Sequence, residues 1–433
     1  MSSLLDLQPK SGKVAPVRVP TFGISEWMCY YVNYDVPGGD RPEAIDECID
    51  KHIEHGIRHI VWNCGRSTVD YWSDLPHTTQ QCEDGAMVGG KDWSFVATVM
   101  GKVCPLCRAI ELCRAKGVTV LGRLGMNRHY GGPKASAVTS RFAREHPDYY
   151  ERSKPGNPVP HKLCYAIPEV RQERLDILLE IQRIGVDALV LDFCRQMPML
   201  LYHDALVKPF MEKSGKDPRA ADPSNPDDCK DWFQWRADVL TGFMRDLRRE
   251  VRRQEERLGR PCPIVARVPD SAPWLMVAFG LDVERWCKED LVDGTMLSPF
   301  PLCHEDMKRY PEYHVKTAHR YGKFCIGGIG SLKLIRNGML KNTGFYHPHP
   351  VYVLAQEQYK AGVDAMSLYQ SESLVRMDYL KPLLTEVGDK AAVARGVEEM
   401  LDPGTPADYP IGMDWHSKAR HSLRVEIAGD DAL

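Results

Sequence analysis

Short apolar runs alternate with amphipathic segments along most of this chain, and this alternation constrains the fold more than any other feature. Each apolar run has the length and composition of a buried strand. The predicted strands are 20–29, 57–63, 118–123, 188–191, 263–267, 292–297, 323–328 and 363–368. Eight strand-then-helix units with right-handed crossovers predict an α/β fold in which parallel strands close into a (β/α)8 TIM barrel.

The segments between the strands carry apolar residues at the spacing of one helix face. The predicted helices are 41–55, 95–116, 168–184, 232–258, 273–288, 305–320, 349–360, 374–387 and 391–401. An open, doubly wound sheet is the alternative fold, but no G-x-G-x-x-G motif follows an early strand. We therefore expect an N-terminal tail or strap over 1–19, one barrel domain over 20–400 and a C-terminal extension over 401–433.

The overall composition argues against two classes of partner. A net charge of −3 over 433 residues provides no basic surface for nucleic acid. No apolar run approaches the ~18 residues that a membrane helix needs. The first residues lack the basic stretch and apolar core of a signal peptide, which predicts a cytoplasmic protein. The sequence is compatible with a homo-oligomer but does not indicate one.

Fourteen cysteines are spread over the predicted strands and helices. In a cytoplasmic protein we expect all of them to be reduced. Cys104 and Cys107 form a C-x-x-C pair, with Cys113 nearby, in the middle of the predicted helix 95–116. Because no second pair accompanies it, thiols packed in a helix are favoured over a zinc or redox site.

The fourth predicted strand carries charged residues into a long polar loop. Gly185 is expected to end the preceding helix, and the apolar run 188–191 then leads to Asp192 and Arg195. A parallel α/β enzyme delivers its active-site groups in this way, at the carboxyl ends of its strands. The alternative is a structural ion pair between Asp192 and Arg195.

The other strand ends supply polar side chains to the same face of a barrel. Carboxylates, guanidinium groups, amides and flat aromatic rings together suit a polyhydroxylated ligand, and paired carboxylates suit glycosidic cleavage. The candidate catalytic residues are Asp192, Asp270 and Glu372. The candidate substrate-binding residues are Glu26, Arg66, Tyr71, Arg123, Asn127, His129, Arg195, Arg267 and Tyr369.

A second set of aspartates precedes strands rather than following them. The phrase Gly-Val-Asp-Ala occurs before strands four and eight, and Val-Asp-Gly occurs before strand six. At these places the chain turns from a helix into the next strand, on the face opposite the pocket. Asp187, Asp293 and Asp364 are therefore predicted to be structural.

Two other kinds of site are weaker alternatives. The histidines near the strand ends do not show the H-E-x-x-H spacing of a metal site, so no metal or cofactor is expected. The glycines of 327–331, after strand seven, could supply free backbone N–H groups to a phosphate, as barrels often do there. The other interpretation is that these glycines permit close backbone packing.

Several motifs resemble those of the bacterial glycosyl-hydrolase-like barrels called family-10-like. They are Phe142-x-x-x-His146-Pro147, Ala166-x-Pro168-Glu169-Val170-Arg171, Val186-Asp187-x-x-x-Leu191-Asp192-Phe193-x-Arg195, Tyr202, Gly215-x-Asp217-Pro218-Arg219 and Trp232-x-x-Trp235-Arg236. The resemblance covers about residues 20–380 and implies a barrel that acts on a carbohydrate, with Asp192 in the site. Retaining members of the wider clan place Glu at the ends of strands four and seven. Here those strands end in Asp192 and in glycines, so that two-Glu assignment does not carry over.

The leading hypothesis is a glycoside hydrolase-like enzyme with a carbohydrate substrate. Asp192 would act as nucleophile or charge stabiliser, and Glu372 or Asp270 as general acid/base. Glu372 is preferred because strand eight lies across the pocket from strand four, whereas Asp270 has the alternative of capping the helix that begins at Pro273. Arg195 and Arg267 would position these carboxylates or bind an acidic sugar, and Tyr369 would stack on the ring. A phosphosugar isomerase or lyase and a catalytically inactive sugar-binding barrel are the alternatives.

Overall fold

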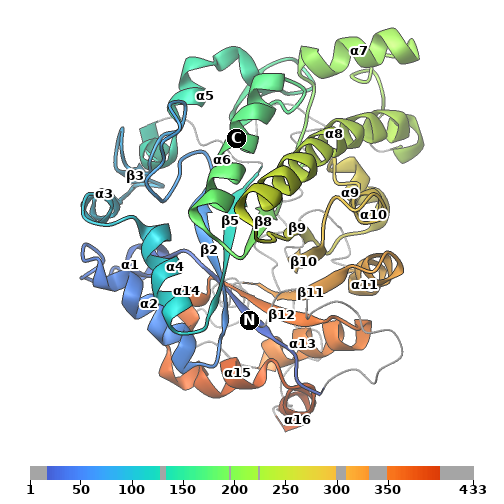
Figure 1. Ribbon diagram of the computed structural model, residues 1–433. Coiled ribbons are helices and arrows are strands. Elements are labelled where there is room, and N and C mark those ends of the chain that lie inside the picture. The colour runs from blue at the N-terminus through green and yellow to red at the C-terminus, as the bar shows by residue number, and fades with distance from the viewer. Residues whose placement is uncertain are drawn as a thin grey trace.

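Eight parallel strands close into a barrel, with the helices arranged around it (Figure 1). The computed structural model describes residues 17–126, 133–194, 197–222, 225–298, 309–330 and 349–399. Around the barrel the strands follow the order β1-β12-β11-β10-β9-β8-β5-β2, so neighbours in sequence are neighbours in space. The predicted α/β fold and TIM barrel are confirmed.

Each of the eight predicted strands overlaps an observed one. The barrel strands are β1 (Thr21–Ser25), β2 (His59–Gly65), β5 (Thr119–Gly125), β8 (Ala188–Asp192), β9 (Ile264–Pro269), β10 (Gly294–Ser298), β11 (Phe324–Ile329) and β12 (Ala365–Tyr369). Two antiparallel hairpins lie in the loops after β2 and β5. They are formed by β3 (Met87–Val88) with β4 (Lys91–Asp92), and by β6 (Tyr150–Arg152) with β7 (Pro158–Leu163).

The described helices cover the outside of the barrel and its loops. They are α1 (Trp27–Tyr34), α2 (Glu43–Glu54), α3 (Ser94–Met100), α4 (Pro105–Ala115), α5 (Arg141–Glu145), α6 (Pro168–Ile184), α7 (Asp204–Ser214), α8 (Pro226–Leu258), α9 (Pro273–Ala278), α10 (Val283–Lys288), α11 (Pro311–Arg320), α13 (His349–Ala361), α14 (Ser371–Leu374), α15 (Lys381–Glu386) and α16 (Lys390–Glu399). None of these helices is long and apolar enough to cross a membrane.

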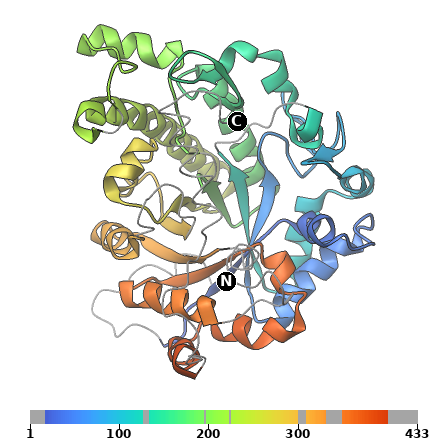
Figure 2. The same cartoon turned by 180° about the vertical axis from the view of Figure 1, so that it is seen from behind.

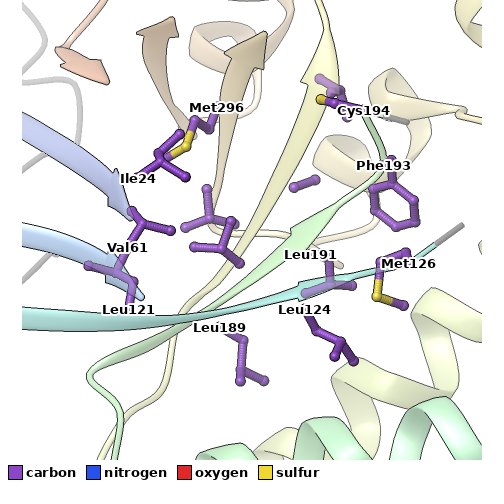
Figure 3. Packing of buried hydrophobic residues seen from close by; sticks show 14 of the residues in the cluster. Ile24, Val61, Leu121, Leu124, Met126, Leu189, Leu191, Phe193, Cys194 and Met296 are labelled. Carbon is purple, nitrogen blue, oxygen red and sulfur yellow. The ribbon is translucent and has the colours of Figure 1, made fainter. Parts of the chain in front are cut away.

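The barrel strands are apolar on both faces because both faces are buried. In Figure 3, Ile24, Val61, Leu121 and Met296 point toward one another inside the barrel, whereas Leu189 points toward the helices. All five side chains are at most 2% exposed. Since side chains alternate along a strand, the residues two positions after Ile24, Val61 and Leu121 also face the interior, near its carboxyl end.

The first strand is shorter than predicted. It ends at Ser25, and the predicted strand residues that follow form α1 instead. These residues continue the apolar run of the strand and include the aromatic Trp27, which is typical of strands. Tertiary packing decides otherwise, because Trp27, Met28 and Tyr31 lie on one helical face and are buried against the core.

The predicted helix 95–116 is two helices, α3 and α4. Pro105 occupies the first position of α4, where its missing N–H costs nothing, and Cys104 is the N-cap residue. The C-x-x-C pair therefore lies at a helix N-terminus. The prediction that it lies in the middle of a helix is wrong. The thirteen cysteines in the described ranges are all unbridged, and Cys303 lies outside those ranges.

The aspartates before strands four, six and eight join neighbouring strands at the amino end of the barrel. In each case one residue of the preceding strand accepts a bond from the Asp backbone N–H and donates its own N–H to the Asp Oδ2, at 2.7–2.9 Å. The pairs are Asp187 with Val120, Asp293 with Ile264, and Asp364 with Cys325. The predicted structural role of these three residues is confirmed.

The described N-terminal residues run as a strap beside the last helices (Figure 2). The Val19 N–H donates to Gly388 O at 2.8 Å, and the Lys390 N–H donates to Val17 O at 3.0 Å. Arg18 and Asp389 form an ion pair at 3.8 Å. The remainder of the predicted tail, 1–16, and all of the predicted extension 401–433 lie outside the described residues.

Asp187→Ala should lower the free energy of unfolding by about 1–3 kcal/mol, because it leaves the Val120 N–H without its acceptor between two strands. Asp187→Asn keeps an acceptor oxygen and should lose less. Glu256→Ala, on the exposed face of α8, is the control and should stay within about 0.5 kcal/mol of the parent protein. Urea unfolding measures all three. Equal stability of Asp187→Ala and the control would contradict a role for Asp187 in joining the strands.

Candidate active site

Seven of the predicted site residues form one connected, buried group at the carboxyl end of the barrel. They are Glu26, Arg66, Arg123, Asp192, Arg267, Tyr369 and Glu372. Asp270 lies at the end of β9 on the same face. Asn127, His129 and Arg195 lie outside the described residues.

Arg123 is the residue that joins this group. It points into the barrel from β5 and is 3% exposed. Its Nη1 donates to Asp192 Oδ2 at 2.7 Å, and its Nη2 donates both to Glu26 Oε1 and to Asn63 Oδ1, the latter at 2.7 Å. One guanidinium of β5 thus connects β2 and β8 with Glu26, the residue that directly follows β1.

Asp192 is an ionised carboxylate whose two oxygens each accept two hydrogen bonds. Arg267 Nη1 lies 2.9 Å from Oδ1 and 3.0 Å from Oδ2, and the Cys194 N–H donates to Oδ1 at 3.0 Å. Arg123 provides the fourth bond. Burial alone would raise the pKa of Asp192, but Arg267 and Arg123 outweigh it and lower that pKa to about 2.

Glu26 is also held ionised, by a different pair of arginines. Arg66 and Arg123 both donate to its Oε1, while its Oε2 accepts a weak bond from the Cys29 thiol at 3.3 Å. Burial again favours the neutral acid, yet the two guanidinium groups hold the pKa of Glu26 well below its ordinary value. Of the two carboxylate oxygens of Glu26, Oε2 is therefore the one with the weaker hydrogen bond.

Glu372 has the opposite electrostatic environment. It is fully buried in α14, and its Oε2 accepts the Glu26 backbone N–H at 3.2 Å. Burial, followed by the negative charge of Glu26, raises the pKa of Glu372 from 4.5 to about 8. Two neighbouring carboxyl groups therefore differ in charge at neutral pH: Glu26 is ionised and Glu372 is protonated.

The position of Glu372 is fixed by a hydrogen-bond chain from α2. The Ser371 hydroxyl and His52 Nε2 are 2.8 Å apart, and His52 Nδ1 lies 2.7 Å from Cys48 O. Burial lowers the pKa of His52 to about 4, so the imidazole is neutral. Its Nδ1–H then donates to Cys48 O and its Nε2 accepts the Ser371 proton. This arrangement needs Gly23, because a Cβ there would lie 2.6 Å from the His52 ring.

Tyr369 and Tyr71 are both buried but have different surroundings. The Tyr369 ring lies below two guanidinium groups, with Arg267 at 4.7 Å and Arg123 at 5.9 Å from its centroid. Tyr71 instead lies close enough to Glu180 and Arg174 of α6 for their charges to affect its pKa, so it is on the helix side of the barrel wall. Tyr369 belongs to the connected group, and Tyr71 does not.

Asp270 is buried, and its Oδ2 has no hydrogen-bond partner among the residues that the structure describes. Burial raises its pKa well above the ordinary value, and the charge of Arg309 only partly opposes this effect. The alternative role of helix cap is not observed, since the N-cap residue of α9 is Ala272 and no side chain caps that helix. Asp270 is thus a second buried acid on this face.

The structure adds two polar residues, Asn63 and Ser298, that were not among the predicted site residues. Asn63 donates to Asp70 Oδ2, and burial raises the pKa of Asp70 to about 7. The Ser298 Oγ accepts from Arg267 Nη2 at 2.8 Å. Asn63 was detectable, because it lies two positions after Val61 in a predicted strand and so faces the interior. The bond between His52 and Ser371 has no signal in the sequence.

The glycines considered for phosphate binding pack against a neighbouring side chain instead. Gly327 and Gly328 lie inside β11 and not after it. The Gly328 N–H donates to Gln358 Oε1 at 2.7 Å, and a Cβ on Gly327 would collide with the same side-chain oxygen. The expectation of free N–H groups at these two residues is wrong, and close packing explains them; Ser331 lies outside the described residues. Within the described ranges, no three His, Cys, Asp or Glu side chains are grouped to hold a metal ion.

Neither a protein-family model nor a curated protein sequence matches the chain. The predicted membership of the family-10-like barrels therefore stays a prediction.

Solved structures do match the chain. An α-L-fucosidase isoenzyme 2 from Paenibacillus thiaminolyticus aligns over 88% of this chain and 50% of its own, with 12% identity and a TM-score of 0.51. A trehalose-6-phosphate hydrolase from Bacillus licheniformis aligns over 92% and 79%, at 11% identity and a TM-score of 0.45. A GH18 chitinase from Cycas revoluta aligns over 86% and 99%, at 10% identity and a TM-score of 0.42. This chain spans half the length of the fucosidase, and at this identity the likeness shows a shared barrel fold alone.

Glu372→Gln should change how stability depends on pH. Between about pH 4.5 and pH 8 the folded protein keeps a proton on Glu372 that the unfolded chain has released, so rising pH across this window favours unfolding. Glutamine has no proton to lose. Stability of the variant, measured by urea unfolding at pH 5 and pH 8.5, should therefore rise relative to the parent as pH increases. A difference between the two proteins that is the same at both pH values would show that Glu372 is not protonated by its surroundings.

Proposed function

We propose that this barrel is a glycoside hydrolase-like enzyme that cleaves an O-glycosidic bond of a carbohydrate substrate. The observation that carries the proposal is the pair Glu26 and Glu372, whose pKa values are moved in opposite directions by their surroundings. Glycosidic cleavage needs one protonated and one ionised carboxyl group in the same site. The barrel fold shared with a fucosidase is compatible with this chemistry.

Glu372 is the general acid in this proposal. With a pKa of about 8 it carries a proton at neutral pH and can pass it to the glycosidic oxygen as the bond breaks. After proton transfer the same group is a base. The bond between Ser371 and His52 keeps the short helix that bears Glu372 in place during this exchange.

Glu26 is the ionised partner, and Asp192 is the charge stabiliser. Glu26 Oε2 has only a thiol as donor in the described structure, so this oxygen can face the anomeric carbon or a water molecule. All four hydrogen-bonding positions of Asp192 are engaged, which suits a fixed negative charge near an oxocarbenium-like transition state better than bond formation. Arg66, directly after β2, contacts Glu26, and Arg267 of β9 contacts Asp192.

The kinetic test compares substrates that differ in leaving group. Glu372→Gln should lose about 100-fold or more in turnover on glycosides whose leaving group needs protonation, and far less on nitrophenyl glycosides. Glu26→Gln should lose turnover on both kinds of substrate, because the ionised group acts on the anomeric carbon. The anomeric configuration of the product, followed by proton NMR, distinguishes a nucleophile from a base at Glu26.

Asp270→Asn is the matched comparison, because Asp270 is another buried acid on this face whose pKa is raised by burial. It should retain turnover on both kinds of substrate within a few-fold. If Asp270→Asn shows the leaving-group dependence and Glu372→Gln does not, the general acid is Asp270. A parent protein that binds sugars in calorimetry but cleaves none of them would contradict the proposal and favour a sugar-binding barrel.

A further inference from the structure

Cys104 and Cys107 lie together at the N-terminus of α4, on the outside of the barrel. Cys104 is the N-cap residue, Pro105 follows at the first helical position, and the Cys107 N–H donates to Cys104 Sγ at 3.3 Å. The two thiols are also within hydrogen-bonding reach of each other. Residues three apart lie on the same side of a helical turn, so the sulfurs can meet without moving the helix.

The two thiols differ in charge and in exposure. Cys107 is exposed, whereas the Cys104 residue is 4% exposed. The hydrogen bond from the Cys107 thiol, with backbone N–H groups at the helix start, outweighs burial and lowers the pKa of Cys104 to about 6. Cys113 is buried near the C-terminus of the same helix and shows the opposite effect, because burial raises its pKa to about 12. The Cys104 and Cys107 thiols thus share one proton, and moving it from Cys107 to Cys104 leaves the attacking thiolate on the exposed sulfur, as thiol–disulfide exchange requires.

A shallow hollow beside the exposed Cys107 offers a place where a small molecule could lie. The hollow, of about 470 Å³, lies between α4 and α6 and is lined by Cys107, Ile110, Glu111, Arg114, Ala115 and Ile184. Its walls combine apolar side chains with one cation and one anion. A small disulfide that carries amino and carboxylate groups matches both features.

We propose that Cys104 and Cys107 are a reversible dithiol–disulfide site that exchanges with low-molecular-weight disulfides. The Cys107 thiol first passes its proton to the Cys104 thiolate, and the Cys107 thiolate so formed attacks one sulfur of RS–SR and expels RS⁻, which takes that proton from Cys104. The Cys104 thiolate then attacks Cys107 Sγ, forms the protein disulfide and expels the second RS⁻, which solvent protonates. The two cysteines are oxidised, and the small disulfide is reduced to two thiols.

The sequence allows a direct test by mass spectrometry. Trypsin cleaves after Lys102 and Arg108, and the peptide between them, 103–108, holds these two cysteines and no others. The full-length protein is equilibrated with mixtures of reduced and oxidised glutathione, quenched with an alkylating reagent and digested. As the oxidised fraction rises, the doubly alkylated peptide should be replaced by an unalkylated disulfide form, whose mass is that of the free dithiol peptide less two hydrogen atoms. Dithiothreitol should reverse the change.

Variants separate the two roles. Cys104→Ser should accumulate glutathione on Cys107, because no second thiol is present to displace it, whereas Cys107→Ser should accumulate little on the buried Cys104. Cys113→Ser is the control and should form the peptide disulfide as the parent does. A parent protein that stays doubly alkylated in every mixture, or that keeps a glutathione mixed disulfide on Cys107, would overturn the proposal.

Discussion

The structure depends on one buried guanidinium, that of Arg123, which holds two carboxylates at the carboxyl end of the barrel. Taking an ion out of water costs several kcal/mol, and only close partners can offset that cost. Arg123 and Arg267 offset it for Asp192, and Arg123 with Arg66 does so for Glu26. Because these partners lie in β5, β8 and β9 or directly after β1 and β2, the charges are placed only when the barrel is assembled.

The same group of charges creates the asymmetry on which the proposed chemistry relies. Arginine is abundant around Glu26 and Asp192, so these carboxylates remain ionised. Glu372 receives backbone N–H groups but no arginine in the described structure, and it meets the negative charge of Glu26 instead. A protonated and an ionised carboxyl group can therefore coexist at neutral pH in one buried site.

The carboxylates at the two ends of the barrel differ in their hydrogen bonds. At the amino end, Asp187, Asp293 and Asp364 each accept a backbone N–H from the neighbouring strand, and their role is stability. At the carboxyl end, Asp70 and Asp270 each have a buried oxygen with no partner among the described residues. Unsatisfied buried acids cost stability, and they are found where a fold reserves polar groups for a ligand.

The sequence was sufficient for the barrel because strand positions depend on local apolar runs, and all eight were recognised. It was sufficient to place Asp192 at the carboxyl end of a barrel strand, because that position follows directly from the apolar run before it. The pairing of Arg123 with Glu26 was not predictable, since 97 residues separate them. The position of Tyr71 outside the connected group was not predictable either, because Tyr71 lies in the loop after β2, where the alternation of a strand no longer indicates which way a side chain points.

The opposite protonation of Glu26 and Glu372 can be observed directly by infrared difference spectroscopy at neutral pH. Subtracting the spectrum of Glu372→Gln from that of the parent protein should leave the carbonyl band of a protonated carboxylic acid. Subtracting the spectrum of Glu26→Asp should leave no such band for residue 26, because that group is ionised in the parent. A parent spectrum in which Glu372 contributes only the bands of a carboxylate would contradict the account.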